Sequence, residues 1–545
     1  MKSWTRRKVL QSSIYAAGSF AFGSLIWRSR SGQPPDLTIP GQLLGPASAA
    51  GHKLRDGFHF PPPSEVRDTN VLILGGGIAG LSAGWRLQRR GIKDFRLLEL
   101  ENEVGGNSRS GQNSISKFPW GAHYVTVLNE EAKFATELFE DLGIITGWKN
   151  ARPVYNEYFL CQAPHERLFI LQKWQEGLVP KIGVPDHDAA DAKAFFERVE
   201  RLRQQKGRDG RYAFTIPLNL SSTDSEYRDL DRISMQQYLR QNGWNSKSLQ
   251  WYVNYCCRDD YGTPYNETSA WAGMHYYCSR RGRADGAEGS TVLTWPEGNG
   301  WIVDKLRSRL QSSISTDAMG IHIQQSSQGV TVNTWSETTQ KVTQWNAKSL
   351  ILAVPRFVAD RLVTPSGGQV RIDKDAMSYA PWLVASVTLR AQPSSGAGVP
   401  QAWDNVFYDS RSLGYVVATH QRPSIHAGAS VWTYYRPLDH LPPSEARKEA
   451  RAKTAEQWKR EVIEDLQLAH PQIDQLIDGI DVWTWGHAMV RPTPGFIWGA
   501  SRREMQRSAG RIHYAHSDMS GLSIFEEANY HGVRAADEAI EHDLG

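Results

Sequence analysis

Residues 70–84 read Asn-Val-Leu-Ile-Leu-Gly-Gly-Gly-Ile-Ala-Gly-Leu-Ser-Ala-Gly, and this stretch constrains the fold more than any other. Its branched apolar run, residues 71–74, predicts a buried parallel strand that leads into spaced glycines and then a helical pattern. In this spacing Gly75 turns the chain sharply, Gly77 lets the backbone approach a pyrophosphate, and Gly80 lets the helix pack on the strand. The start of the helix, at Ile78 and Ala79, offers free amide hydrogens and a partial positive charge to the phosphates.

A second strand pattern covers residues 95–98 and ends at Glu99. That position, about twenty residues beyond the glycines, is where a carboxylate accepts a hydrogen bond from a ribose hydroxyl. Strand, glycines, helix, second strand and acidic residue together predict a dinucleotide site. The alternative is a glycine-rich turn in an unrelated βαβ unit, which leaves Glu99 as a coincidence.

Composition describes a soluble globular protein, with 22% charged and 40% hydrophobic residues. A chain of 545 residues exceeds one simple core, so we expect two domains. Six of the 62 basic residues precede the first acidic residue, Asp36, and the remaining 56 nearly balance the 58 acidic ones. This balance argues against a nucleic-acid partner, which requires a concentrated basic face.

The N-terminus has the pattern of a targeting segment. Thr-Arg-Arg-Lys-Val-Leu at 5–10 resembles a twin-arginine export signal, and residues 12–27 form a modestly apolar stretch, rather short for a membrane span. We therefore expect export to the periplasm by the twin-arginine machinery, with the segment cleaved or kept as an inner-membrane anchor. The alternative is an ordinary basic N-terminus before a short anchor.

Four cysteines, at 161, 256, 257 and 278, do not make a disulfide framework. Buried free thiols are the preferred interpretation, with one bridge involving Cys278 as the alternative. The adjacent pair at 256 and 257 lacks the spacing of a metal or redox site, and no metal is expected.

The later parts of the chain alternate between nucleotide-domain patterns and other material. Residues 321–323 and 330–333 alternate as a hairpin would, residues 349–355 predict a second buried strand, and residues 443–466 predict one long charged helix. The last block, residues 511–544, predicts a strand, a turn and a helix. A simple nicotinamide dehydrogenase would complete its sheet in consecutive βα units, so this interleaving points elsewhere.

Five segments carry a family resemblance. They read Val-Gly-Gly-Asn-Ser-Arg-Ser (104–110), Phe-Pro-Trp-Gly-Ala-His-Tyr (118–124), Trp-Pro-Glu-Gly-Asn-Gly (295–300), Leu-Ile-Leu-Ala-Val-Pro (350–355) and Tyr-Ala-His-Ser-Asp (514–518). With the glycine stretch, they resemble the flavin-containing amine oxidase superfamily, whose members include monoamine and polyamine oxidases, with phytoene desaturases as relatives.

The resemblance implies an α/β architecture, in which a Rossmann-like FAD-binding domain with a parallel sheet is interleaved with an α+β substrate-binding domain. The expected segments are a twin-arginine signal at 1–30, a linker or arm at 31–65, FAD-binding parts at 66–126, 290–365 and 486–545, and substrate-binding parts at 127–289 and 366–485. The implied FAD contacts are Gly75, Gly77, Ile78, Ala79, Gly80, Glu99, Gly105, Gly106, Arg109, His123, Val330, Asp518, Phe525 and Glu527. The cysteine-free tail implies non-covalent FAD.

The sequence also departs from the family. Many oxidases carry a lysine, associated with the reaction of the flavin with oxygen, on a strand matching residues 382–389, but no lysine occurs between Asp375 and Arg390. The electron acceptor therefore stays open between oxygen, a quinone and a cytochrome. For catalysis we single out His487, His516 and Phe525, with a structural hydrogen-bonding role as the alternative for each histidine.

The preferred function is oxidation of a small amine by hydride transfer to FAD, giving an imine that hydrolyses. The alternative is a flavin desaturase or dehydrogenase acting on a carbon–carbon bond of an apolar or aromatic substrate. A flavoprotein with structural FAD and no turnover is a third interpretation, and a pure nicotinamide enzyme is disfavoured because the tail motif would then lack a purpose.

Overall fold

The glycine stretch opens the first sheet of the protein. Residues 71–74 form the buried end of β2 (Glu65–Leu74), which runs directly into α3 (Ile78–Arg89) as expected. The computed structural model describes residues 39–287, 291–364, 377–422 and 428–544. Of its two units, residues 1–39 and 40–545, the second holds everything described below.

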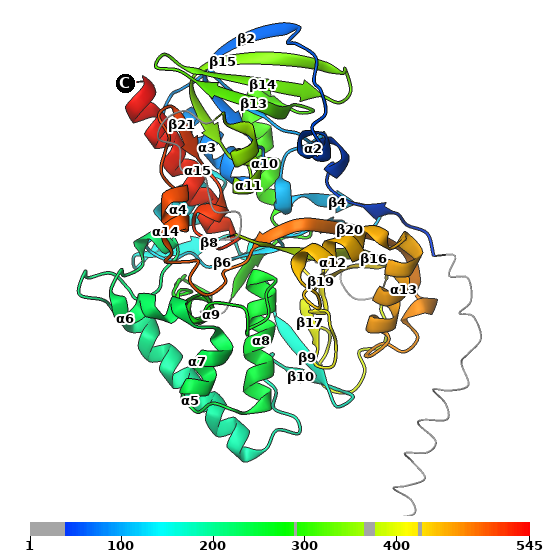
Figure 1. Cartoon of the computed structure of the whole chain (residues 1–545). Coiled ribbons are helices and arrows are strands. Elements are labelled where there is room, and N and C mark those ends of the chain that lie inside the picture. Colours follow the sequence, from blue (N-terminus) through cyan, green and yellow to red (C-terminus); the bar gives the residue numbers. More distant parts are fainter. Residues whose placement is uncertain (1–38, 288–290, 365–376, 423–427, 545) are drawn as a thin grey trace, which may run out of the picture. The chain divides into compact units, whose positions relative to one another are not determined.

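The first sheet combines a parallel core with an antiparallel hairpin (Figure 1). Its order is β12 (Ile314–Ser315), β3 (Phe95–Leu98), β2, β15 (Lys341–Leu352), β14 (Val330–Ser336) and β13 (Met319–Gln325), and β21 (Ile512–Tyr514) pairs with the end of β15. The neighbours from β12 to β15, and β21, are parallel, whereas β13, β14 and β15 are antiparallel. The expected hairpin and second buried strand are confirmed.

Helices from distant parts of the sequence pack beside α3. They are α4 (Lys133–Asp141), α10 (Gly300–Leu310) and α15 (Phe525–Ala539), and α11 (Arg356–Leu362) contacts β13. Contact is closest between α3 and α15, where a Cβ at Gly532 would lie 2.1 Å from the carbonyl oxygen of Ala79. This sheet and its helices therefore make a Rossmann-like layer assembled from three separated stretches of chain.

The second sheet has eight strands and mixed directions. Its order is β1 (Leu43–Leu44), β20 (Ile477–Val490), β16 (Tyr379–Leu389), β19 (Ser430–Pro437), β18 (Tyr415–Val417), β17 (Asp404–Phe407), β9 (Glu166–Ile170) and β10 (Lys173–Glu176). Further helices are α5 (Asp186–Gln204), α6 (Ser225–Arg228), α7 (Met235–Gln241), α8 (Lys247–Tyr261), α9 (Ala270–Cys278) and α14 (Ala500–Met505). Short strand pairs join β4 (Ser110–Gln112) to β5 (Lys117–Pro119), β6 (Tyr124–Thr126) to β11 (Val292–Thr294), and β7 (Ile145–Lys149) to β8 (Arg152–Tyr155). The α/β class with a second, mixed sheet is confirmed.

The predicted single helix at 443–466 is wrong, because two helices occupy this segment. α12 (Pro443–Ala452) ends before Thr454, whose side chain accepts a hydrogen bond from the backbone of Gln457 and starts α13 (Ala455–Leu466). The Gln457 side chain reciprocates, which makes a capping box.

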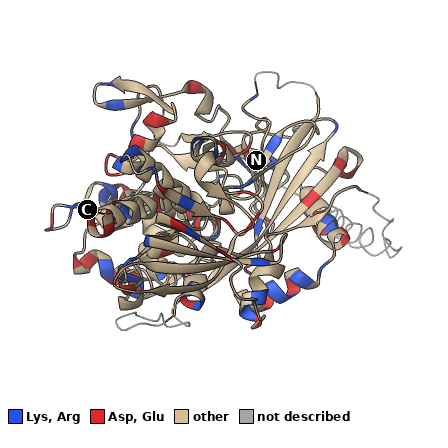
Figure 2. Cartoon of the chain, turned by 90° about the horizontal axis from the view of Figure 1, so that it is seen from above, with Lys and Arg blue, Asp and Glu red and all other residues tan. Residues whose placement is uncertain are grey.

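The described part of the arm is ordered against the body. β1 pairs with β20, and α2 (Ser48–Arg55) contacts β13. No described helix is long and apolar enough to cross a membrane. The twin-arginine pattern and apolar stretch lie outside the described residues. Figure 2 shows Lys and Arg interspersed with Asp and Glu over the described elements.

Candidate active site

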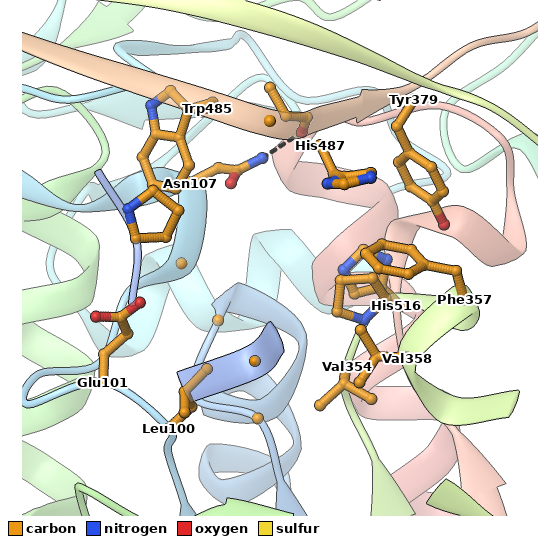
Figure 3. Close-up of a pocket in the computed structure, with 18 of the residues that line it drawn as sticks. Leu100, Glu101, Asn107, Val354, Phe357, Val358, Tyr379, Trp485, His487 and His516 are labelled. Carbon is orange, nitrogen blue, oxygen red and sulfur yellow. Dashed lines mark hydrogen bonds between the residues drawn. The ribbon is translucent and has the colours of Figure 1, made fainter. Parts of the chain in front are cut away.

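A cavity of about 750 Å³, called the cofactor cavity here, lies at the carboxyl ends of β2 and β3. The glycine loop before α3, the end of β3 with Glu99, the turn at Gly105 and Gly106, and the segment 516–518 all line it. Figure 3 shows part of this lining, with Glu101 and Asn107 opposite Phe357 and His516. A parallel sheet commonly binds ligands at this edge.

The glycines give the cavity its floor. Gly75 has φ +107°, a left-handed conformation that favours glycine, and a Cβ there would lie 2.4 Å from the carbonyl oxygen of Ala353. No atom lies within 4 Å of a Cβ built at Gly77, so the backbone faces open space at the start of α3. The positive end of this helix is thus exposed to a ligand phosphate.

Glu99 is held in place beside this loop. Its two carboxylate oxygens accept hydrogen bonds from the backbone of Gly76 at 2.6 Å and of Glu101 at 2.9 Å. Burial raises the pKa of the Glu99 carboxyl, and the two backbone bonds oppose that rise. The carboxyl group lines the cavity where the sequence predicts a ribose contact.

Asp518 presents an unsatisfied oxygen in the same cavity. Its Oδ2 accepts hydrogen bonds from the backbone of Arg356 at 2.9 Å and from the Tyr379 hydroxyl at 2.5 Å. Its Oδ1 lies 3.1 Å from Nδ1 of His516 but makes no hydrogen bond within the described part of the chain, although the residue is only 1% exposed. Burial opposes ionisation, but His516 and these hydrogen bonds together lower the Asp518 pKa. A buried carboxylate oxygen without a donor fits a hydroxyl-bearing ligand such as the ribityl chain of FAD.

Arg109 is bound to the protein itself. Its guanidinium pairs with Glu103 at 2.6 Å and Glu101 at 3.3 Å and lies 5.2 Å from the Trp483 ring centroid. Asn107 donates a hydrogen bond to the carbonyl oxygen of Ala488 (Figure 3). This bond links the second glycine motif to β20.

The predicted catalytic residues all line the cofactor cavity. His487 stacks on Phe357 with ring centroids 4.7 Å apart, and burial, assisted by Arg447 and Arg451, lowers its pKa to about 4. The imidazole is therefore neutral near pH 7. The Nδ1 atom of His516 accepts a hydrogen bond from the Asp518 backbone, and Phe525 starts α15.

Four of the predicted cofactor residues do not line the cofactor cavity. Gly80 packs against the Gly75 carbonyl, and Val330 is buried in β14 opposite Ala347. Glu527 is fully buried and accepts hydrogen bonds from Ser520 and the Leu218 backbone, and burial raises its pKa to about 7. His123 lines the two neighbouring cavities described next.

A second cavity of about 150 Å³, called the inner cavity, continues from the first. Its walls include Val125, Ile216, Trp382, Val384 and Met489, so much of its surface is apolar and aromatic. The residues that line both cavities are Asn107, Ala122, Asn299, Trp485, Ala488, Ser523, Ile524 and Phe525. Trp485 is oriented by a 2.6 Å hydrogen bond from its indole nitrogen to the Trp120 carbonyl.

A third cavity of about 1170 Å³, the outer cavity, meets the inner one at a neck. The residues that line both are His123, Tyr124, Thr126, Asp259, Arg280 and Tyr435. Burial lowers the pKa of His123 to about 4, so Asp259 and Arg280 are the groups of the neck that can carry a charge near pH 7. The three cavities therefore adjoin one another in the order outer cavity, inner cavity and predicted cofactor site.

Sequence reasoning missed several residues of this path. Trp382 and Asn299 lay in quoted segments without an assigned role, and Asp259, Arg280 and Tyr435 were given none. The adjacent Asp259-Asp260 pair in a tyrosine-rich helical segment was a usable signal, because buried neighbouring carboxylates are uncommon outside functional sites.

Comparison with known proteins supports this description. Residues 73–142 match the NAD(P)-binding Rossmann-like domain family. Dimethylglycine dehydrogenase, mitochondrial, of Rattus norvegicus is 28% identical over 133 residues, covering 24% of this chain and 14% of the relative. Polyamine oxidase 7 of Oryza sativa subsp. japonica is 38% identical over 72 residues, covering 13% of this chain and 15% of the relative. The chain thus spans about a seventh of each curated relative.

Solved structures match over far more of the chain. A double mutant of putrescine oxidase has a TM-score of 0.66 at 15% identity, covering 87% of this chain and all of the other. Cyclohexylamine oxidase from Brevibacterium oxydans IH-35A has a TM-score of 0.60 at 15% identity, covering 87% and 99%. A CLA-producing fatty acid isomerase from P. acnes has a TM-score of 0.56 at 16% identity, covering 86% and 98%. The two-sheet architecture, the Rossmann-like match and these neighbours agree: the chain has a flavin amine oxidase-like fold.

Proposed function

We propose that this protein is an FAD-dependent oxidoreductase that oxidises a small amine. The observation that carries the proposal is the shared wall between the cofactor cavity and the inner cavity. A dinucleotide held by the glycine loop has the inner cavity beside it, and a substrate there is reached from the outer cavity through the neck. The neighbouring amine oxidases share this fold.

The described residues fit FAD. The exposed start of α3 beside Gly77 would hold the pyrophosphate, Glu99 would accept a bond from the ribose, and the free Oδ1 of Asp518 would accept one from the ribityl chain. Bound FAD supplies a hydride acceptor for the carbon next to the substrate nitrogen.

The chain's own residues position the substrate and exclude water. Trp485 and Phe525 line both cavities and are 8% and 6% exposed, so they form a dry wall where substrate and cofactor meet. A low-dielectric surrounding disfavours the ammonium form of an amine and so favours the neutral form, which can lose hydride. Correct placement of the reacting carbon supplies a large share of the rate acceleration.

We further propose that the electron acceptor is a quinone or a cytochrome rather than oxygen. Arg280 is the one lysine or arginine lining the inner cavity among the residues the structure describes. In the resembling oxidases a lysine near the flavin is associated with the oxygen reaction. Slow reoxidation of the reduced flavin by air, with fast reoxidation by a soluble quinone, is the expected outcome.

A second candidate is oxidation of a carbon–carbon bond. The apolar walls of the inner cavity favour it, and the fatty acid isomerase shares the fold. The Asp259 carboxylate in the neck would attract a cationic amine, but it would not attract an uncharged or acidic apolar substrate.

The test is an absorption spectrum of the purified full-length protein, followed by anaerobic addition of putrescine, cyclohexylamine, benzylamine and a long-chain fatty acid. Bleaching of the flavin bands by an amine supports the proposal. Bleaching by the fatty acid alone supports the second candidate. A flavin that none of the probes reduces points to a structural cofactor, and a protein that cannot bind flavin contradicts both candidates.

We also propose that the folded flavoprotein is exported by the twin-arginine machinery. The pattern at residues 5–10 supports this, and the machinery carries proteins that fold around their cofactor first. Replacing both arginines, Arg6→Lys with Arg7→Lys, should keep the flavoprotein inside the cell. Unchanged export of the double variant would contradict the proposal.

A further inference from the structure

Asp259 occupies a position shared by two cavities. It lies in the last turn of α8, and it is the one carboxylate that lines both the inner and the outer cavity among the described residues. Asp260 and Glu526 line the inner cavity, and Glu166 and Asp404 line the outer one. A cation that moves from the outer cavity to the inner one therefore passes Asp259.

Asp259 also differs in its bonding from three of these carboxylates, Asp260, Glu526 and Asp404. Asp260 pairs with Arg280 at 2.6 Å, Glu526 accepts a bond from Thr126 at 3.0 Å, and Asp404 accepts one from Tyr435 at 3.0 Å. Asp259 makes no hydrogen bond or ion pair within the described part of the chain. Its carboxylate is therefore available to a ligand.

The groups around Asp259 act against its charge. Burial and the neighbouring Asp260 raise the pKa of its carboxyl to about 7, Arg280 opposes the rise, and Glu166 adds to it. Asp404 of β17 also interacts with it, and so do Tyr124, Tyr255, Tyr435 and Cys256 among the described residues. A carboxyl group whose pKa lies near pH 7 can both accept and release a proton at that pH.

An independent observation is an unpaired hydrogen-bond acceptor, the side-chain oxygen of Asn299, in the wall of the inner cavity. Asn299 is 1% exposed and donates a hydrogen bond to the Tyr124 carbonyl through Nδ2, while its Oδ1 has no partner among the residues that the structure describes. Asn299 lines both the cofactor and the inner cavity. Because a buried amide oxygen is normally satisfied, this side of the cavity suits a ligand with an N–H group.

We propose that Asp259 binds the substrate ammonium in the neck and accepts one of its N–H protons before hydride transfer. This inference rests on the proposed amine oxidation. The ammonium loses a proton and becomes the neutral amine, and the Asp259 carboxylate gains that proton and becomes a carboxylic acid. The acid then releases the proton to water in the outer cavity, which restores the carboxylate.

The step matters because very little of an alkylamine is in its neutral form at pH 7. An alkylammonium such as the lysine side chain has a pKa of about 10.4, so roughly one molecule in 10³ is neutral at pH 7. A positioned general base typically contributes about 10²–10⁴-fold in rate. Aromatic walls favour the neutral amine, and Asp259 supplies a group that accepts the released proton and passes it to water in the outer cavity.

The experiment compares the full-length, FAD-loaded wild type with Asp259→Asn in anaerobic stopped flow, using whichever of putrescine and cyclohexylamine reduces the wild type. For the wild type, the limiting reduction rate should fall below about pH 7 and level off above it. For Asp259→Asn, the rate at pH 7 should drop by about 10²-fold or more and climb with pH toward the pKa of the amine.

Three comparisons make the result specific. Asp259→Glu should restore much of the wild-type profile, and Glu200→Gln, which removes a carboxylate from the outer cavity away from the neck, should leave it unchanged. Asp259 is not among the cofactor-cavity residues, so the flavin spectrum of Asp259→Asn should match the wild type. An unshifted pH profile, or a change in amine affinity alone, would overturn the inference. Failure of both amines to reduce the wild type would overturn the proposed function first and remove the basis of this step.

Discussion

The Oδ1 atom of Asp518, which makes no hydrogen bond among the described residues, leads to a prediction about FAD binding. Asp518→Asn keeps one oxygen that can accept the hydrogen bonds from Arg356 and Tyr379. It replaces the oxygen that faces the cavity with an uncharged NH₂ group, which donates hydrogen bonds instead of accepting them. A hydrogen bond to a charged group contributes about 1.5–3 kcal/mol, so FAD affinity should weaken by roughly 10- to 100-fold. Fluorescence titration of the apoprotein with FAD measures this.

The matched control is Asp478→Asn, an exposed aspartate that pairs with Arg390 far along β20. It should leave FAD affinity unchanged. Equal affinities for wild type and Asp518→Asn would show that Asp518 does not contact the cofactor.

The cysteines make a second residue-scale prediction. All four are buried free thiols, and burial raises the pKa of Cys256 and of Cys278 to about 12. A thiol with so high a pKa is almost entirely protonated at pH 8 and unreactive. Ellman's reagent at pH 8 should detect almost no thiol in the native protein and four after unfolding in guanidinium without reductant. Two missing thiols after unfolding would indicate a disulfide.

Local motifs predicted residues that line the cofactor cavity better than residues that line the inner and outer cavities. Gly75 and Glu99 lie at fixed offsets within strand–turn segments, so their spacing places them at the carboxyl edge of the sheet, and the family resemblance of residues 514–518 adds Asp518. Asp259 of α8 and Tyr435 of β19 both line the neck although they are far apart in the sequence, and no local pattern specifies this. The residues of the neck could not be predicted from the sequence, because contacts between distant segments bring them together.

At the scale of elements, the contact between α3 and α15 holds the cofactor layer together. Gly532→Ala would place a methyl group 2.1 Å from the Ala79 carbonyl oxygen, so the two helices must move apart. Overpacking of this kind typically costs about 1–3 kcal/mol, and α3 carries the phosphate-binding loop. We expect a lower free energy of unfolding in urea and faster loss of FAD.

A glycine with free space is the control. No atom lies within 4 Å of a Cβ built at Gly147 in β7, so Gly147→Ala should change stability by only a few tenths of a kcal/mol. Full stability of Gly532→Ala would mean that the helices are not in the close contact described.

Element prediction succeeded where periodicity was local and failed where a cap intervened. The hairpin of β13 and β14 followed from alternation around Gly329, and β15 from its apolar run. The sequence pattern did not predict the division between α12 and α13, because charged residues continue through the boundary between the two helices. The Thr454 and Gln457 pair, a threonine followed three residues later by glutamine, was the missed evidence.

At the scale of the whole molecule, the nucleotide layer is completed by segments at both ends of the described chain. β2 and α3 come early, β15 lies in the middle, and β21 and α15 come last. The interleaved motif order anticipated this architecture, because each motif belongs to the same sheet edge. The chain between the motifs builds the second sheet and the helices that line the inner and outer cavities.

The central claim is that the inner cavity holds the substrate beside the bound flavin. Val384 lies in β16, is 4% exposed, and lines the inner cavity without lining the cofactor cavity. Val384→Phe should fill the inner cavity and leave FAD binding intact. The decisive measurement is the anaerobic bleaching rate of the flavin bands by an amine, in the wild type and in this variant. The account predicts bleaching of the wild type and a rate at least about tenfold lower in Val384→Phe at equal flavin content. Equal rates, or a wild-type flavin that no amine bleaches, would contradict it.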